Sequence, residues 1–127
     1  MSTILVVEDT EDNYDLIADA FEDEHDLVRA ITGPEALAQA ATIRPDLILL
    51  DMGLPVFDGF EVVRRLKADA ELVHVPVVAL TSHAMTGDRE KCMEAGCDDY
   101  LSKPIDVREL RGLVEQYLAN KHTILKG

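Results

Sequence analysis

Charged and hydroxyl-bearing side chains follow several apolar runs of this sequence, at the point where each run ends. Glu8 and Asp9 come directly after the run at residues 4–7, and Asp51 comes directly after the run at residues 47–50. A hydroxyl and an ammonium follow two later runs, at Thr81 and Lys103. If the runs are parallel strands of one sheet, ligands bind beyond their carboxyl ends. The sequence therefore predicts three carboxylates, a hydroxyl and an ammonium at one edge of a sheet.

This combination of groups favours phosphoryl chemistry around a divalent cation. Two carboxylates about 4 Å apart repel by about 4 kcal/mol at an effective dielectric of about 20, so the cluster needs a compensating charge. Lys103 can neutralise one carboxylate, and the remaining hard oxygen donors suit Mg²⁺. A cation held there, beside a hydroxyl and an ammonium, is a site for phosphoryl oxygens. Neither GxxxxGKS/T nor GxGxxG occurs, so we expect the phosphate to be received, with Asp51 as nucleophile.

Each of these residues also has a simpler structural interpretation when it is taken alone. Asp9 could cap the helix that follows, and Asp51 could cap a turn before Pro55. Thr81 could bond a strand-end backbone group, and Lys103 could be an ordinary surface lysine. Their joint placement at successive strand ends is what favours a functional site.

The apolar runs themselves predict the elements that position these groups. The runs at 4–7, 47–50 and 75–80 are continuous, as expected of parallel strands covered on both faces. Residues 27–31 and 100–101 are predicted as two further strands. Helical patterns lie between the strands, so the order strand-helix occurs five times and predicts a doubly wound α/β fold.

Local signals place the ends and faces of the predicted helices. Ile17 and Phe21 are spaced to point inward from the first helix, and Pro34 suits the first turn of the second. Gly96 is a plausible C-cap, and Asp106 is predicted to be the N-cap of the last helix.

Composition limits the class of protein. The 127 residues suffice for one domain, and 47% hydrophobic with 29% charged residues is typical of a globular protein. The net charge of -13 argues against binding to nucleic acid or to an anionic membrane surface. No run approaches the roughly 20 apolar residues of a membrane helix, and the N-terminus lacks signal-peptide character, so we expect a cytoplasmic protein. Cys92 and Cys97 lack metal-finger spacing and are expected to be reduced thiols.

Four segments resemble the sequence blocks of response-regulator receiver domains of two-component signalling. They are ILVVEDTEDN, PDLILLDMGLPVFDG, VPVVALTSHAM and AGCDDYLSKPI, in the family's order and spacing. The resemblance runs from about residue 3 to 119 and is closest to receivers of hybrid sensor kinases and to stand-alone regulators of the CheY and DivK type. It implies a (βα)5 fold with a five-stranded parallel sheet in the flavodoxin-like order 2-1-3-4-5. We expect a receiver domain at residues 1–120, a short tail at 121–127 and no output domain.

The resemblance assigns a phosphoacceptor and a metal site. Asp51 is implied to accept a phosphoryl group from a sensor histidine kinase or a histidine phosphotransfer protein. Asp9, Asp51 and the backbone carbonyl of Gly53 are implied to bind Mg²⁺, and Glu8 to hold the ion through water.

A second group of residues is implied to form the switch. Lys103 would pair with Asp51 and then with a phosphoryl oxygen, and its peptide bond to Pro104 is expected to be cis. Thr81 would move to bond the phosphoryl group, and Tyr100 would follow by moving inward. Access to the phosphate is assigned to Gly53, Ser82 and His83. Because Gly53 has no side chain, we hypothesise that it leaves the phosphate open to water or to a phosphatase.

The implied partners are proteins. Output would pass to a downstream protein target through a face that includes Arg89, Tyr100, Val107 and Arg111. The first helix, around Asn13 and Tyr14, would meet the phosphodonor. A weak homodimer is a further option, whereas nucleic acid and membrane are not expected as partners.

Two other functions compete with that of a phosphorylated signalling protein, which is not itself an enzyme in the usual sense. A phosphatase of the haloacid dehalogenase type also uses a strand-end aspartate and Mg²⁺, but it needs an acid two residues after the nucleophile, where this chain has Gly53. A pseudo-receiver would bind partners without phosphorylation, and the complete set of polar residues counts against it. That set is Glu8, Asp9, Asp51, Thr81 and Lys103.

Overall fold

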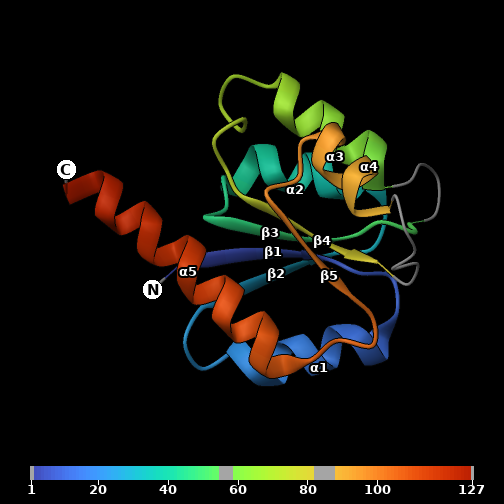
Figure 1. Ribbon diagram of the computed structural model, residues 1–127, viewed down its shortest axis with the longest axis vertical. Coiled ribbons are helices and arrows are strands. Elements are labelled where there is room, and N and C mark those ends of the chain that lie inside the picture. Colours follow the sequence, from blue (N-terminus) through green and yellow to red (C-terminus); the bar gives the residue numbers. More distant parts are fainter. Residues whose placement is uncertain (1, 55–58, 82–87, 127) are drawn as a thin grey trace.

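The computed structural model describes residues 2–54, 59–81 and 88–126 of the chain. Strands and helices alternate throughout this part, as the sequence predicts (Figure 1). In chain order they are β1 (Thr3–Val7), α1 (Glu11–Phe21), β2 (Asp26–Ala30), α2 (Gly33–Ile43), β3 (Leu47–Asp51), α3 (Gly59–Ala68), β4 (Val77–Thr81), α4 (Asp88–Ala95), β5 (Asp99–Ser102) and α5 (Val107–Lys126).

The five strands form one parallel sheet in the order β2-β1-β3-β4-β5. Helices α1 and α5 cover one face, and α2, α3 and α4 cover the other (Figure 1). This arrangement confirms the predicted doubly wound, flavodoxin-like fold. Because the strand order reverses beside β1 and β3, the carboxyl ends of these two strands border the crevice where such folds bind ligands.

Burial on both faces explains why the central strands read as continuous apolar runs. Ile4 and Val6 pack with α1 and α5, whereas Leu5 and Val7 pack with the helices of the other face. All four side chains are fully buried. Because helices pack against both faces of β1, the end of the strand is held in place, and so are the residues that directly follow it.

Several predicted boundaries shift in the structure. Strand β4 begins at Val77 and not at residue 75, because Val75 closes a turn with Leu72 and Pro76 has no N–H to donate. Strand β2 ends at Ala30, one residue earlier than predicted. Helix α5 extends to Lys126 through the segment expected to be a short tail, because no glycine or proline follows Gly112 until the last residue.

The predicted caps are confirmed. Asp106 Oδ1 accepts from the backbone N–H groups of Arg108 at 2.9 Å and Glu109 at 3.3 Å. Gly96 has φ +118°, a conformation that favours glycine, and its N–H donates to the carbonyl of Met93 after α4. Within the described ranges no helix is both long enough and apolar enough to cross a membrane.

Candidate functional site

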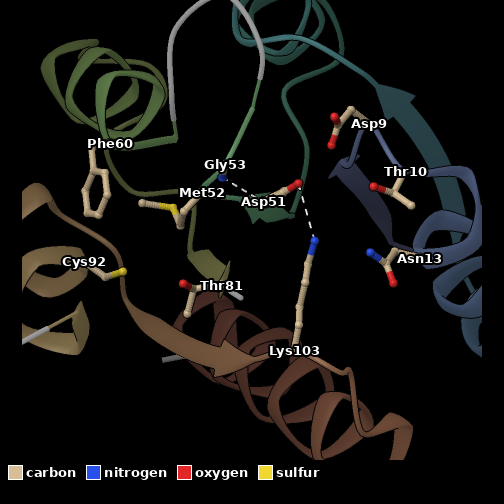
Figure 2. Close-up of a pocket in the computed structure, with 10 residues that line it drawn as sticks. All are labelled: Asp9, Thr10, Asn13, Asp51, Met52, Gly53, Phe60, Thr81, Cys92 and Lys103. Carbon is tan, nitrogen blue, oxygen red and sulfur yellow. Dashed lines mark hydrogen bonds and ion pairs between the residues drawn. The ribbon is translucent and has the colours of Figure 1, made fainter. Parts of the chain in front are cut away.

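A cavity of about 440 Å³ opens at the carboxyl edge of the sheet and collects most of the predicted site residues (Figure 2). Its lining residues come from the carboxyl ends of β1, β3, β4 and β5, from the start of α1, and from helices α3 and α4 (Figure 2). We call this the Asp51 cavity. It is lined by Asp9, Thr10, Asn13, Asp51, Met52, Gly53, Phe60, Thr81, Cys92 and Lys103.

Three carboxylates gather at the cavity, as the sequence predicts. One oxygen from each of Glu8, Asp9 and Asp51 lies within 4.8 Å of the other two. Glu8 is fully buried and Asp51 is 6% exposed, whereas Asp9 lies on the surface. Two of the three charges are therefore held away from water, where their mutual repulsion is weakly screened.

Lys103 supplies the positive charge among these groups. Its Nζ lies 2.8 Å from Glu8 Oε1 and 3.4 Å from Asp51 Oδ2. The ammonium thus lies closer to Glu8 than to the residue with which it was expected to pair. The backbone at Lys103 is held by its N–H, which donates to the carbonyl of Thr81 at 2.7 Å. The bond from Lys103 to Pro104 is cis, as expected.

Asp51 has its two carboxylate oxygens directed to different partners. Oδ1 accepts from the backbone N–H of Gly53 at 2.9 Å, and Oδ2 faces Lys103. The interpretation of Asp51 as a turn-stabilising residue is therefore correct for one oxygen. The other oxygen lies with the ammonium in the Asp51 cavity (Figure 2), which a turn alone does not require.

The turn after β1 orders its two acids differently. Glu8 Oε2 accepts from the N–H of Thr10 at 3.1 Å, and Glu8 Oε1 faces Lys103. Thr10 occupies the N-cap position of α1, so Asp9 is not the cap of that helix. In the described part of the chain the Asp9 carboxylate accepts no hydrogen bond and forms no ion pair.

These donors fit a hard divalent cation. Three carboxylates beside one ammonium leave a surplus of two negative charges. The Asp9 carboxylate has no described partner and lies within 4.8 Å of the Asp51 oxygen, the spacing of oxygens that can share one ion. Oxygen ligands of this kind suit Mg²⁺, which retains part of its water shell.

The other predicted residues are placed as follows. Thr81 is buried and lines the Asp51 cavity at the end of β4. Tyr100 is half-buried and packs with the core beneath α2, α3 and α4. Ser82 and His83 lie outside the described residues, as does Pro55.

The residues predicted to form one partner face do not all come together. Arg89 is exposed on α4, and Val107 is half-buried at the start of α5. Arg111 points to the opposite side of the sheet from Tyr100, because its guanidinium bonds the Ala20 carbonyl at 2.5 Å and lies 5.4 Å from the ring centre of Phe21.

Four residues that line the Asp51 cavity were not predicted from the sequence to belong to the site. Thr10, Met52, Phe60 and Cys92 join it because the turns after β1 and β3 and the helices α3 and α4 converge there. Met52 follows Asp51 and Thr10 follows Asp9, so adjacency was the only signal available for two of them. Nothing in the pattern around Phe60 and Cys92 distinguishes them from ordinary core residues.

Two cysteines lie close together beside this site. Cys92 and Cys97 are both buried thiols that are not joined by a disulfide. Burial, followed by the nearby Cys92, raises the pKa of Cys97 to about 12, so its thiolate is scarce at neutral pH.

Comparison with known proteins places the chain beside one family. The sequence model of the response regulator receiver domain matches residues 4–115. The polar-differentiation response regulator DivK of Brucella anthropi is 43% identical over 119 residues, which is 93% of this chain and 97% of that protein. DivK of Brucella melitensis is 42% identical over the same shares.

Solved structures agree in fold. The receiver domain of sensor histidine kinase PA1611 from Pseudomonas aeruginosa, which has a magnesium ion coordinated in its active-site cleft, has a TM-score of 0.86 at 35% identity. The match covers 93% of this chain and 98% of that one. A response regulator from Chloroflexus aurantiacus has a TM-score of 0.88 at 29% identity, covering 93% and 98% of the two chains.

Proposed function

The chain belongs to the response-regulator receiver family of two-component signalling. From this premise we propose that it is a phosphoacceptor whose active residue is Asp51. Members of this family are signalling proteins and not classical enzymes. The donor would be a phosphohistidine on a sensor kinase or on a phosphotransfer protein. The receiver domain would comprise residues 1–120, and phosphorylation would change the face that binds a downstream protein.

One observation carries this proposal. The carboxylate of Asp51 is buried at the end of β3, in one cavity with the ammonium of Lys103, the hydroxyl-bearing Thr81 and the acid Asp9. A structural aspartate at a strand end needs only the backbone bond that Gly53 supplies. The remaining groups have no role in that bond. Lys103 and Thr81 can donate to phosphoryl oxygens, and Asp9 can hold a cation beside them.

The proposed reaction transfers the phosphoryl group between two nucleophiles. A carboxylate oxygen of Asp51 forms a bond to phosphorus while the bond from phosphorus to the donor's imidazole nitrogen breaks, and the electron pair returns to that nitrogen. The Gly53 N–H and the Lys103 ammonium hold the carboxylate in place for attack. Lys103 lies where it can pass from the carboxylate to a phosphoryl oxygen.

Asp9, Asp51 and the Gly53 carbonyl would hold Mg²⁺, with Glu8 behind them. The bound ion supplies positive charge against the phosphoryl oxygens. Glu8, whose two oxygens are already directed to Lys103 and Thr10, contributes mainly by fixing the ammonium and the turn.

The switch would act through Thr81 and Tyr100. To move a two-state equilibrium from 1:99 to 99:1 requires about 5.5 kcal/mol of differential interaction. Charge-assisted hydrogen bonds from Thr81 and Lys103 to the phosphoryl group, at about 1.5–3 kcal/mol each, approach that value. A downstream partner that prefers the phosphorylated form would supply the remainder. Its docking face is proposed to include Arg89, Tyr100 and Val107. Helix α1 would meet the donor in the cytoplasm.

Intact mass measured after incubation with acetyl phosphate tests the proposal. The wild-type protein should gain one phosphoryl group in Mg²⁺ and none in excess EDTA, and Asp51→Asn should gain none. Absence of any addition to the wild-type protein would instead favour a pseudo-receiver that binds its partners without phosphate. Rapid hydrolysis of many equivalents of acetyl phosphate would favour a phosphatase.

A further inference from the structure

An arginine on the edge strand β2 contacts the backbone of the acidic turn, by which we mean residues 8–10. The Nε–H of Arg29 donates to the backbone carbonyl of Glu8 at 3.2 Å. That carbonyl belongs to the peptide bond that joins Glu8 to Asp9. Strand β2 ends one residue later, at Ala30, whose carbonyl accepts the Glu8 N–H at 3.0 Å. The side chain of Arg29 therefore bonds the turn at the point where sheet pairing stops.

The same guanidinium also contacts α1, the helix that follows the acidic turn. Its central carbon lies 4.7 Å from the ring centre of Tyr14 on α1. A guanidinium over an aromatic face at this distance is attracted by the ring's negative face. Arg29 thus joins β2, the acidic turn and α1, and both Arg29 and Tyr14 are half-buried.

Asp9 depends on this contact more than Glu8 does. Both carboxylate oxygens of Glu8 have partners of their own, Lys103 and the Thr10 N–H. The Asp9 carboxylate has no described partner, so its position follows from the backbone that carries it. A rotation of the peptide bond between Glu8 and Asp9 would move this carboxylate away from Asp51.

We propose that Arg29 and Tyr14 are positioning residues that hold the acidic turn in its metal-binding geometry. Neither residue has a ligand atom at the cluster, and each acts through the Glu8 carbonyl or through the other. Groups that orient metal ligands commonly change metal affinity when they are altered. This inference rests on the proposed Mg²⁺-dependent function, which supplies the ion whose binding is measured.

Charge must be kept constant in the test, because deleting the arginine would by itself favour a cation. Arg29→Lys retains the positive charge but loses the planar guanidinium, and Tyr14→Leu retains neutrality but loses the ring. Tyr14→Phe keeps the ring and serves as the conservative variant. Tyr117→Phe is the stability control, because it removes a hydroxyl that donates to the Asp98 carbonyl at 2.9 Å. This bond lies at the start of β5, at the opposite end of the strand from the Asp51 cavity.

Two measurements on the full chain decide the matter. Isothermal titration with MgCl₂ should show Arg29→Lys and Tyr14→Leu binding at least threefold more weakly than the wild-type protein, with Tyr14→Phe and Tyr117→Phe within twofold of it. Thermal unfolding confirms that each variant is folded at the titration temperature. Unchanged affinity in Arg29→Lys and Tyr14→Leu, or an equal loss in Tyr117→Phe, would overturn the proposal.

The second measurement needs no metal and separates this inference from the proposed function. In EDTA, amide hydrogen exchange at Asp9 and Thr10 should be faster in Arg29→Lys and Tyr14→Leu than in the wild-type protein, and unchanged in Tyr117→Phe. If the wild-type protein binds no Mg²⁺, the proposed function fails while the exchange result still reports on positioning. Equal exchange in all the proteins would show that Arg29 and Tyr14 do not hold the turn.

Discussion

Replacing Lys103 by glutamine tests whether one ammonium stabilises the acidic cluster. Its Nζ lies 2.8 Å from Glu8 Oε1 and 3.4 Å from Asp51 Oδ2. The Lys103 side chain is 12% exposed, and the side chains of its two partners are 0% and 8% exposed. Glutamine is close in length and polar but carries no charge. The substitution therefore leaves two buried carboxylates facing each other.

The expected loss follows from these distances. At an effective dielectric of about 20, a charge pair at the shorter distance gains about 6 kcal/mol and a pair at the longer distance about 5 kcal/mol. Removing the ammonium also removes its own desolvation cost, which amounts to several kcal/mol for a buried ion. The net loss in unfolding free energy should then be about 3–5 kcal/mol, the usual range when one partner of a buried ion pair is deleted.

Urea unfolding at neutral pH in EDTA measures this loss. Lys91→Gln is the matched control, since Lys91 is an exposed lysine on α4 and the change in net charge is the same. The control should change the unfolding free energy by no more than about 0.5 kcal/mol. In MgCl₂ the gap between Lys103→Gln and the wild-type protein should narrow, because bound Mg²⁺ supplies positive charge to the same carboxylates.

Two results would refute this reasoning. A loss below about 1 kcal/mol for Lys103→Gln, or one no larger than that of Lys91→Gln, would mean that the cluster tolerates its own repulsion without the ammonium. A gap that is unchanged in MgCl₂ would mean that the carboxylates do not share a cation.

Three further predictions concern single residues. Burial, and then the nearby Asp99 carboxylate, raises the pKa of Tyr117 from 10.0 to about 12. As pH rises, the unfolded chain therefore loses the Tyr117 proton before the folded chain does. The free energy of unfolding should then fall between these two pH values. Urea midpoints should therefore fall less steeply with pH in Tyr117→Phe than in the wild-type protein, and equal slopes would contradict this. Gly53→Asn should slow loss of the phosphoryl group severalfold, because the added side chain would shield the phosphate from water. A Cβ at this position would lie 3.7 Å from Asp51 Oδ1, so it fits without a clash. Intact mass measures the rate of loss, and an unchanged rate would show that Gly53 does not set the phosphate lifetime. Gly59→Ala should lower the free energy of unfolding in urea by about 1–3 kcal/mol, because its Cβ would lie 2.7 Å from two atoms of Met52. An unchanged free energy would mean that the turn after β3 relaxes to accept the methyl group.

The fold could be predicted because its central strands are buried on both faces. Residues 4–7 and 47–50 must be apolar at every position for that reason, so their pattern indicates parallel strands without further information. The first charged residue after such a run then marks the sheet edge, which is how Glu8 and Asp51 could be placed in one site. Element ends were less certain, since Pro76 delays strand pairing in a way that an apolar run does not reveal.

The pairings within the site could not be predicted in the same way. Sequence order places Lys103 at the sheet edge, but the choice between Glu8 and Asp51 depends on side-chain directions that only the packed structure fixes. Arg29 gave no signal, because one arginine in an edge strand is usually a solvated side chain. Its contact with the Glu8 carbonyl arises only once β1 and β2 pair in register.

Glu8 is fully buried, although charged side chains are rarely buried without partners. Its contacts explain this burial. Its two oxygens fix the Lys103 ammonium and the Thr10 N–H, so the glutamate ties β5 and α1 to the end of β1. That leaves the more exposed Asp9 without a described partner and available to a ligand. Local rules of stability are most often broken at functional sites. The buried acid then holds the site rigid, while the exposed acid remains available to bind a cation.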